Sequence, residues 1–133
     1  MSRRILITGG AGFIGSHLAR RFADQHEVTV LDDLRSGYAR NLEGVRCRFL
    51  HGSILDAGAL RQAAEGAEEI YHLAAMISVP ESVAKPAECA ELNTEGTRRV
   101  LDAALAAGAR KVVLASSAAI YGDNPTVPKL ESM

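Results

Sequence analysis

A cluster of glycines stands where a short apolar run gives way to a segment with helical spacing. The apolar run is Arg4-Ile5-Leu6-Ile7-Thr8, the cluster is Gly9-Gly10-Ala11-Gly12-Phe13-Ile14-Gly15, and helical spacing continues over residues 13–24. A strand, a glycine loop and a helix in this order are typical of dinucleotide-binding proteins. Glycines let the backbone approach a pyrophosphate closely, and the N–H groups at the start of the helix hold the anion. The glycines expected to bind the dinucleotide are Gly9, Gly12 and Gly15.

An acidic residue makes this motif more specific. Asp32 follows a second apolar run, residues 27–31. It comes about 20 residues after the glycine loop, the spacing at which a carboxylate meets the adenosine ribose. Such a carboxylate accepts hydrogen bonds from the ribose hydroxyls and repels a 2′-phosphate, which predicts a preference for NAD over NADP. Arg35, three residues further on, is a cation that would offset this repulsion. The alternative interpretation is a glycine-rich turn followed by a solvated aspartate.

The composition is that of one globular domain. The chain has 133 residues, of which 47% are apolar and 23% charged, and its net charge is −1. This balance favours neither a nucleic acid nor a membrane surface as partner. No signal peptide and no apolar stretch of membrane-spanning length are visible. Cys47 and Cys89 lack metal-ligand spacing, so we expect no metal site and reduced thiols in a cytoplasmic protein.

Short runs rich in Val, Ile and Leu alternate with helical segments along the chain. The expected strands are 4–8, 27–32, 46–50, 69–74 and 111–116, and the expected helices are 13–24, 56–65 and 87–107. Runs of this kind are typical of parallel strands buried on both faces. With right-handed crossovers, the alternation predicts an α/β fold, a Rossmann-type doubly wound parallel sheet in the order 3-2-1-4-5. A ligand is then expected at the carboxyl ends of the strands.

Five segments resemble the extended short-chain dehydrogenase/reductases, and among these the NAD-dependent nucleotide-sugar epimerases and dehydratases. The closest resemblance is to 4-epimerases of the UDP-glucose 4-epimerase type. The segments are Thr8–Leu18, Leu31–Gly37, His72–Ala75, Asn93–Thr97 and Ala115–Gly122. Their order and spacing are kept over essentially the whole chain.

The resemblance implies roles for particular residues. The backbone around Phe13 and Ile14 would hold the pyrophosphate of NAD, and Ser117 matches the catalytic serine that hydrogen-bonds the reacting sugar hydroxyl. The residues implied around the ribose are Asp32, Asp33, Leu34, Arg35, Ser36 and Gly37. Those implied at the adenine are Ser53 and Ile54, and those along the rest of the cofactor are Leu73, Ala74, Ala75, Asn93 and Ser116.

Some of these residues also have purely structural interpretations. Asn93 could be a packing amide, Leu73–Ala75 a tight strand end, and Ser116 and Ser117 caps of a strand end; Tyr121 is interpreted as structural. The sequence also departs from the family pattern. Ser53 replaces the usual aspartate, and Ile77 stands where many epimerases have a lysine.

The reaction implied by the resemblance is transfer of a hydride from sugar C4 to NAD and its return to the other face. In the family a tyrosine acts as the base, with a lysine four residues later. The residues four positions after the three tyrosines are Leu42, Ala75 and Pro125. We therefore expect residues 1–133 to be the N-terminal, NAD-binding part of a longer epimerase, without its substrate domain. Alone, this part should be inactive.

Two alternatives and two partners complete these expectations. A 4,6-dehydratase would need an acid or base just after the serine, where the sequence has Ala118 and Ala119. A non-catalytic dinucleotide-binding module is the other alternative. The expected partners are a nucleotide-sugar substrate in the complete protein and a second copy of the chain. Self-association, as a homodimer or otherwise, is expected because the strand at 111–116 would have an open edge.

Overall fold

Five parallel strands form one sheet in the order β3-β2-β1-β4-β5, which confirms the predicted topology. The computed structural model describes residues 1–133. The strands are β1 (Arg4–Thr8), β2 (Glu27–Asp32), β3 (Arg48–His51), β4 (Glu69–His72) and β5 (Lys111–Leu114). The strand order reverses between β1 and β4, which is where ligands bind in doubly wound sheets.

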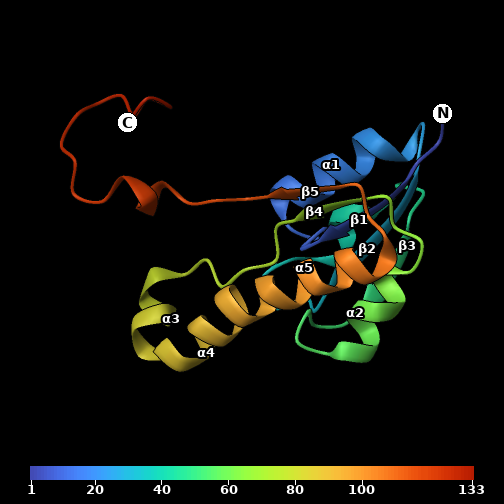
Figure 1. Ribbon diagram of the computed structural model, residues 1–133, viewed down its shortest axis with the longest axis horizontal. Coiled ribbons are helices and arrows are strands. Elements are labelled where there is room, and N and C mark those ends of the chain that lie inside the picture. The colour runs from blue at the N-terminus through green and yellow to red at the C-terminus, as the bar shows by residue number, and fades with distance from the viewer.

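Helices cover both faces of the sheet (Figure 1). They are α1 (Phe13–Ala23), α2 (Ala57–Ala64), α3 (Val79–Ala84), α4 (Pro86–Ala90) and α5 (Gly96–Ala107). Shorter turns are η1 (Ala39–Leu42), the π-helical η2 (Glu91–Glu95) and η3 (Ala118–Tyr121). The Asp56 side chain caps α2 by accepting from the N–H groups of Gly58 and Ala59 at 2.9 and 3.0 Å. Gly66 and Gly108 end α2 and α5 in left-handed conformations, with φ of 71° and 72°.

Alternation along the strands divides the buried residues into two clusters. On one face, Ala19 and Ala23 of α1 pack near Ile5, Ile7 and other strand residues. On the other face, α2 and α5 pack against the side chains that point the opposite way, among them Leu6, Leu31 and Ile70. Figure 1 shows α1 on one side of the sheet and α2 and α5 on the other. Both layers therefore meet a sheet that is apolar on each face, as the unbroken Val/Ile/Leu runs predict.

Several predicted boundaries were wrong. The strands expected at 46–50, 69–74 and 111–116 are Arg48–His51, Glu69–His72 and Lys111–Leu114. At β4 the cause is visible. The Leu73 N–H still donates to the Thr8 carbonyl at 3.0 Å, whereas the Ala74 N–H donates to the Thr8 hydroxyl at 3.3 Å. The helix expected at 87–107 begins at Pro86 and contains the π-helical turn η2, and α3 forms within the expected loop at 76–86.

The segment after β5 leaves the sheet and ends away from it (Figure 1). Apart from Tyr121, which is partly buried, its residues are exposed. On β5 itself, Val113 and Leu114 are 39% and 52% exposed. No helix combines the length and the apolar character needed to cross a bilayer.

Candidate dinucleotide-binding site

A cavity of about 280 Å³ lies at the carboxyl ends of β1, β2 and β4. Most of the predicted cofactor-binding residues line it: Gly9, Gly12, Phe13, Ile14, Gly15, Asp32, Asp33, Arg35, Ser36, Gly37, Ser53, Ile54, Leu73, Ala74 and Ala75. Gly52, Ile77 and Leu92 line it as well and were not among the predicted residues. Gly52 directly follows β3, so its place at a strand end was a usable signal, whereas nothing in the sequence singled out Leu92.

The glycines of the loop differ in how much space surrounds them. Gly9 has φ of 72°, and a Cβ there would lie 2.7 Å from the backbone nitrogen of Ala74. A Cβ on Gly15 would lie 2.3 Å from the carbonyl oxygen of Gly9. Gly12 is different, because an added Cβ would meet only the Gly9 oxygen, at 3.3 Å. Gly9 and Gly15 are therefore needed for the loop to close, while Gly12 leaves space beside the cavity.

The N-terminus of α1 is suited to an anion. Gly12 occupies the N-cap position without a side-chain cap, and the first turn contains no acidic residue. The first N–H groups of a helix have no partner within the helix, and they carry the positive end of its dipole. Phe13 and Ile14 are 79% and 62% exposed, so this turn is not closed off by the core. A pyrophosphate fits this arrangement because backbone donors and an open glycine position meet at one place.

Asp32 joins the glycine loop to the loop after β2. Its side chain is buried, and its two oxygens accept from the N–H groups of Ala11 and Leu34, each at 2.9 Å. Each carboxylate oxygen has a further lone pair for a ligand hydroxyl. Leu34 adopts a left-handed φ of 59° and does not line the cavity. Its predicted cofactor contact stays a prediction, and the contact that the structure shows is the one to Asp32.

Substitution Asp32→Ala is expected to lower both stability and selectivity. It would leave the N–H groups of Ala11 and Leu34 without an acceptor, at a cost of about 1–3 kcal/mol for the buried Ala11 N–H and less for the partly buried Leu34 N–H. It would also remove the charge that opposes a 2′-phosphate, so the preference for NAD over NADP should shrink. Urea denaturation and titration with both cofactors measure the two effects. Asp32→Asn, which keeps one acceptor oxygen, should lose less stability; unchanged stability in Asp32→Ala would contradict the role in the fold.

Ser53 and Ile54 line the cavity from the loop after β3. The Ser53 hydroxyl accepts from the N–H of Leu55 at 3.1 Å, so its own proton is free for another acceptor. Ile54 is buried and packs against Gly96, where a Cβ would lie 2.6 Å from the Ile54 Cδ1 atom. The glycine at the start of α5 thus makes room for the apolar wall of the site.

A buried chain of hydrogen bonds sets the position of the segment after β4. His72 Nδ1 lies 2.6 Å from the Thr8 hydroxyl, and His72 Nε2 lies 3.0 Å from the Thr97 hydroxyl. Thr97 donates to the carbonyl oxygen of Asn93 at 2.7 Å, so its oxygen is left to accept from His72. Because Thr8 accepts from the N–H groups that follow β4, its proton goes to Nδ1. The neutral imidazole with its proton on Nε2 therefore satisfies every partner.

Asn93 holds the same segment from the π-helical turn. Its side-chain oxygen accepts from the N–H of Met76 at 2.7 Å, and its amide donates to the Met76 carbonyl at 3.1 Å. Asn93 does not line the cavity. The contacts shown are those of a packing amide, the structural alternative, and the predicted cofactor contact stays a prediction.

The buried His72 predicts a loss of stability in mildly acidic solution. Burial lowers its pKa below the ordinary value of 6.5, so the unfolded chain takes up the proton more readily than the folded one. Stability is then full above about pH 6.5 and falls as pH decreases from there toward the folded-state pKa. Urea denaturation at pH 7.5, 6.5 and 5.5 measures this. The slope should largely disappear in His72→Gln, and an unchanged slope in that variant would contradict the prediction.

Glu69 contributes in a separate pH range. Burial raises the pKa of this carboxyl, but the hydrogen bond and charge of Arg3, together with Tyr71 and Lys111, outweigh burial and lower the pKa below 4.5. Its contribution to stability is lost only as pH falls below about 4.5. Measurements above pH 5 therefore isolate His72 from Glu69.

Ser116 and Ser117 do not line the cavity. Both are exposed, and the Ser117 hydroxyl accepts from the N–H of Ala119 at 3.1 Å, which caps η3. This contact is structural, but it caps η3 and not the strand end that the alternative interpretation gave. Their predicted roles, as cofactor contact and catalytic serine, stay predictions.

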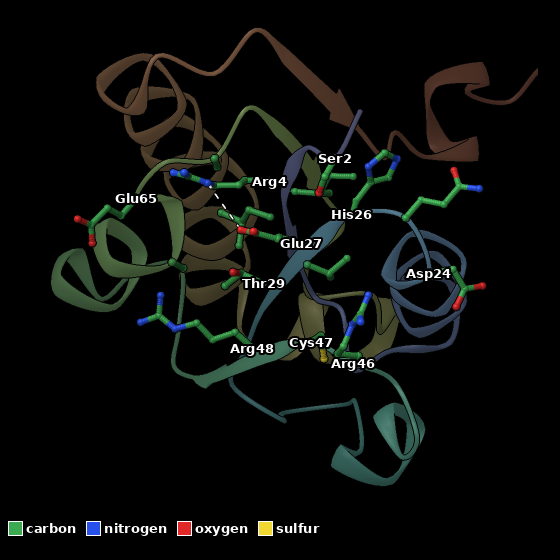
Figure 2. Close-up of a pocket in the computed structure, with 16 residues that line it drawn as sticks. Ser2, Arg4, Asp24, His26, Glu27, Thr29, Arg46, Cys47, Arg48 and Glu65 are labelled. Carbon is green, nitrogen blue, oxygen red and sulfur yellow. Dashed lines mark ion pairs between the residues drawn. The ribbon is translucent and has the colours of Figure 1, made fainter.

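A larger cavity, of about 840 Å³, lies at the opposite, amino ends of β1, β2 and β3 (Figure 2). Its charged residues are of both signs, and Figure 2 shows Arg4 reaching toward Glu27, with 3.7 Å between the charged groups. None of the predicted site residues lines it. Most of the predicted cofactor-binding residues therefore lie at the smaller cavity.

A parallel sheet in the order 3-2-1-4-5, a glycine loop before α1 and an acidic residue at the end of β2 define a Rossmann-type dinucleotide-binding fold. The sequence profile of the NAD dependent epimerase/dehydratase family matches residues 5–133, and the chain belongs to this family.

Three relatives show which members of the family this chain is similar to. It is 47% identical over 137 residues to UDP-glucose 4-epimerase of Mycolicibacterium smegmatis, covering 98% of this chain and 44% of the relative. It is 40% identical over 126 residues to UDP-N-acetyl-alpha-D-glucosaminuronate decarboxylase of Bacillus cytotoxicus, covering 92% of this chain and 39% of the relative. The crystal structure of UDP-glucose 4-epimerase from Brucella ovis in complex with NAD matches with a TM-score of 0.86 and 36% identity. That match covers 98% of this chain and 41% of the Brucella chain. The chain thus spans less than half the length of these three relatives.

Proposed function

We propose that this chain is the NAD-binding portion of a nucleotide-sugar 4-epimerase of the UDP-glucose/UDP-galactose type. The observation that carries the proposal is the cavity at the switch between β1 and β4, where an open Gly12, the start of α1 and Asp32 meet. Similarity to two UDP-glucose 4-epimerases supports the choice of reaction. Bound NAD would supply an acceptor and donor of hydride for C4 of the sugar.

The residues of this chain have distinct parts in the proposal. The backbone around Phe13 and Ile14 binds the pyrophosphate, and Asp32 accepts hydrogen bonds from the ribose hydroxyls. Ser53 and Ile54 contact the adenine. Ser117 donates or accepts a hydrogen bond at the reacting sugar hydroxyl once the segment after β5 lies beside the nicotinamide. In this proposal residues 1–133 are the NAD-binding domain, and other parts of the enzyme complete the sugar site.

Titration of the chain with NAD and NADP tests the cofactor. NAD is expected to bind more tightly, since a 2′-phosphate would lie near the Asp32 carboxylate. Equal affinities for the two cofactors would contradict the proposed role of Asp32, and binding of neither would contradict the proposed function.

The purified chain alone is expected not to interconvert UDP-glucose and UDP-galactose. It contains no tyrosine followed four residues later by lysine, and general-base catalysis contributes about 10²–10⁴-fold. Assays with NAD and each sugar measure turnover. Turnover that disappears in Ser117→Ala would show that a complete site exists without that pair and would refute this prediction.

Self-association is part of the proposal. β5 pairs with β4 on one side only, and Val113 and Leu114 are exposed beside its other edge. Unpaired strand edges recruit further strands. Sedimentation of the chain at several concentrations is expected to show dimers or larger species, and a clean monomer at high concentration would count against it.

A decarboxylase or dehydratase is the second candidate, favoured by the similarity to the Bacillus cytotoxicus decarboxylase. A decarboxylase or a dehydratase would use the same NAD-binding portion as an epimerase. Against a 4,6-dehydratase, the methyl groups of Ala118 and Ala119 cannot move protons where that reaction needs an acid or base. Assay of the complete enzyme with UDP-glucose and UDP-N-acetylglucosaminuronate distinguishes the reactions.

A further inference from the structure

Arg35 joins two elements that are far apart in the sequence. It belongs to the loop after β2 and lines the dinucleotide cavity. Its guanidinium hydrogen-bonds the carboxylate of Glu88 on α4 and lies 3.7 Å from that of Glu81 on α3. All three side chains are about one-third exposed, at 32%, 41% and 34%. The ion pairs therefore form at the rim of the cavity, where a ligand and solvent can both reach them.

The backbone of Arg35 is held independently of these ion pairs. Its N–H donates to the Asp33 carboxylate at 3.0 Å, and the neighbouring Leu34 N–H donates to Asp32. The side chain of Arg35 can therefore exchange one binding partner for another while its backbone stays in place. In the structure its Nη2 group faces both glutamates.

Two carboxylates surround one guanidinium at this point, and Lys85 lies 3.8 Å from the second oxygen of Glu88. An arginine shortly after the ribose-binding acidic residue is the group that accommodates a 2′-phosphate in NADP-binding proteins. With Glu81 and Glu88 engaged on Arg35, a phosphate would have to displace them and would also meet their negative charge. The same arginine without these partners would be an available bidentate ligand for phosphate.

We propose that Glu81 and Glu88 are determinants of cofactor choice: by holding Arg35 they withhold the cation that would bind the 2′-phosphate of NADP. With Asp32, they make the site selective for NAD. This inference rests on the proposed dinucleotide-binding function and extends it to residues of α3 and α4 that do not line the cavity.

The test uses the unaltered chain and the double variant Glu81→Gln/Glu88→Gln, titrated calorimetrically with NAD and with NADP at fixed ionic strength. Glutamine keeps the size of each side chain but removes its charge. We expect NADP to bind about tenfold more tightly to the double variant, the effect of one added charge-assisted hydrogen bond. The dissociation constant for NAD should differ less than about twofold between the double variant and the unaltered chain.

Two further variants make the result specific. Adding Arg35→Ala to the double variant should remove the gain for NADP, because the arginine is the proposed ligand. Glu65→Gln/Glu131→Gln changes the net charge equally at exposed residues that do not line the cavity, and it should leave the NADP-to-NAD ratio nearly unchanged.

The outcomes separate this inference from the proposed function. If the unaltered chain binds NAD but the double variant keeps its NADP-to-NAD ratio, the role of the glutamates is overturned while the proposed function stands. A gain that persists without Arg35, or that the control variant reproduces, overturns it in the same way. If the unaltered chain binds neither cofactor, the proposed function fails, and the inference fails with it.

Discussion

Gly12→Val is expected to abolish dinucleotide binding and to leave the chain folded. Gly12 has φ of −78° and ψ of −179°, a conformation open to any residue, and an added Cβ meets only the Gly9 oxygen at 3.3 Å. The Gly9 oxygen would have to move by only a few tenths of an ångström to admit the branched side chain, which would then occupy the space of the pyrophosphate. Losing two charge-assisted hydrogen bonds to backbone N–H groups corresponds to at least about 100-fold weaker binding.

Calorimetric titration with NAD measures the loss in Gly12→Val, and circular dichroism shows whether the chain stays folded. Gly58→Val is the matched control. Gly58 does not line the cavity, and its added Cβ would lie 3.4 Å from the Asp56 carboxylate, an ordinary contact. NAD should bind this control as it binds the unaltered chain. Binding to Gly12→Val within tenfold of normal would mean that the pyrophosphate lies elsewhere.

Gly15→Val, only three residues away, is expected to disrupt folding. A Cβ there would lie 2.3 Å from the Gly9 oxygen and 2.6 Å from the Gly10 Cα, and both obstacles are backbone atoms. The loop has little freedom to yield, because the Gly9 N–H donates to the Leu31 carbonyl at 2.9 Å. Overpacking of this kind costs about 1–3 kcal/mol and sometimes more, against a typical total stability of about 5–15 kcal/mol.

Urea denaturation of Gly12→Val and Gly15→Val side by side measures this difference. We expect a midpoint near that of the unaltered chain for the first variant, and a much lower midpoint or no folded protein for the second. Equal midpoints would contradict the close packing of Gly15 against Gly9. Together the two variants separate the ligand-facing glycine from the packing glycine of the same loop.

The topology could be predicted because it depends on patterns that are local. Five short apolar runs alternate with amphipathic helices, and right-handed crossovers leave few possible orders for the strands. Strand ends were harder to predict, because the backbone hydrogen bonds between two strands end where an N–H group meets a different acceptor. At β4 the last backbone bond runs from the Leu73 N–H to the Thr8 carbonyl, and the next N–H, that of Ala74, donates to the Thr8 hydroxyl instead. Asn93, in the π-helical turn, likewise bonds the backbone of Met76, a partner that lies outside its own helix.

The strand–loop–helix unit, the acidic residue at the end of the second strand and the family could all be recognised from the sequence, because each rests on motifs made of residues close together in the chain. The partners that those residues meet became known from the fold. From the sequence, Arg35 is a cation that would offset the repulsion of a phosphate. In the fold it faces Glu81 and Glu88, which are more than forty positions away in the chain. His72 likewise finds Thr8 and Thr97 only once β1, β4 and α5 pack together. The reason is that ion pairs and buried hydrogen bonds between distant residues follow no local period, so they exist only after the sheet and its helices have assembled.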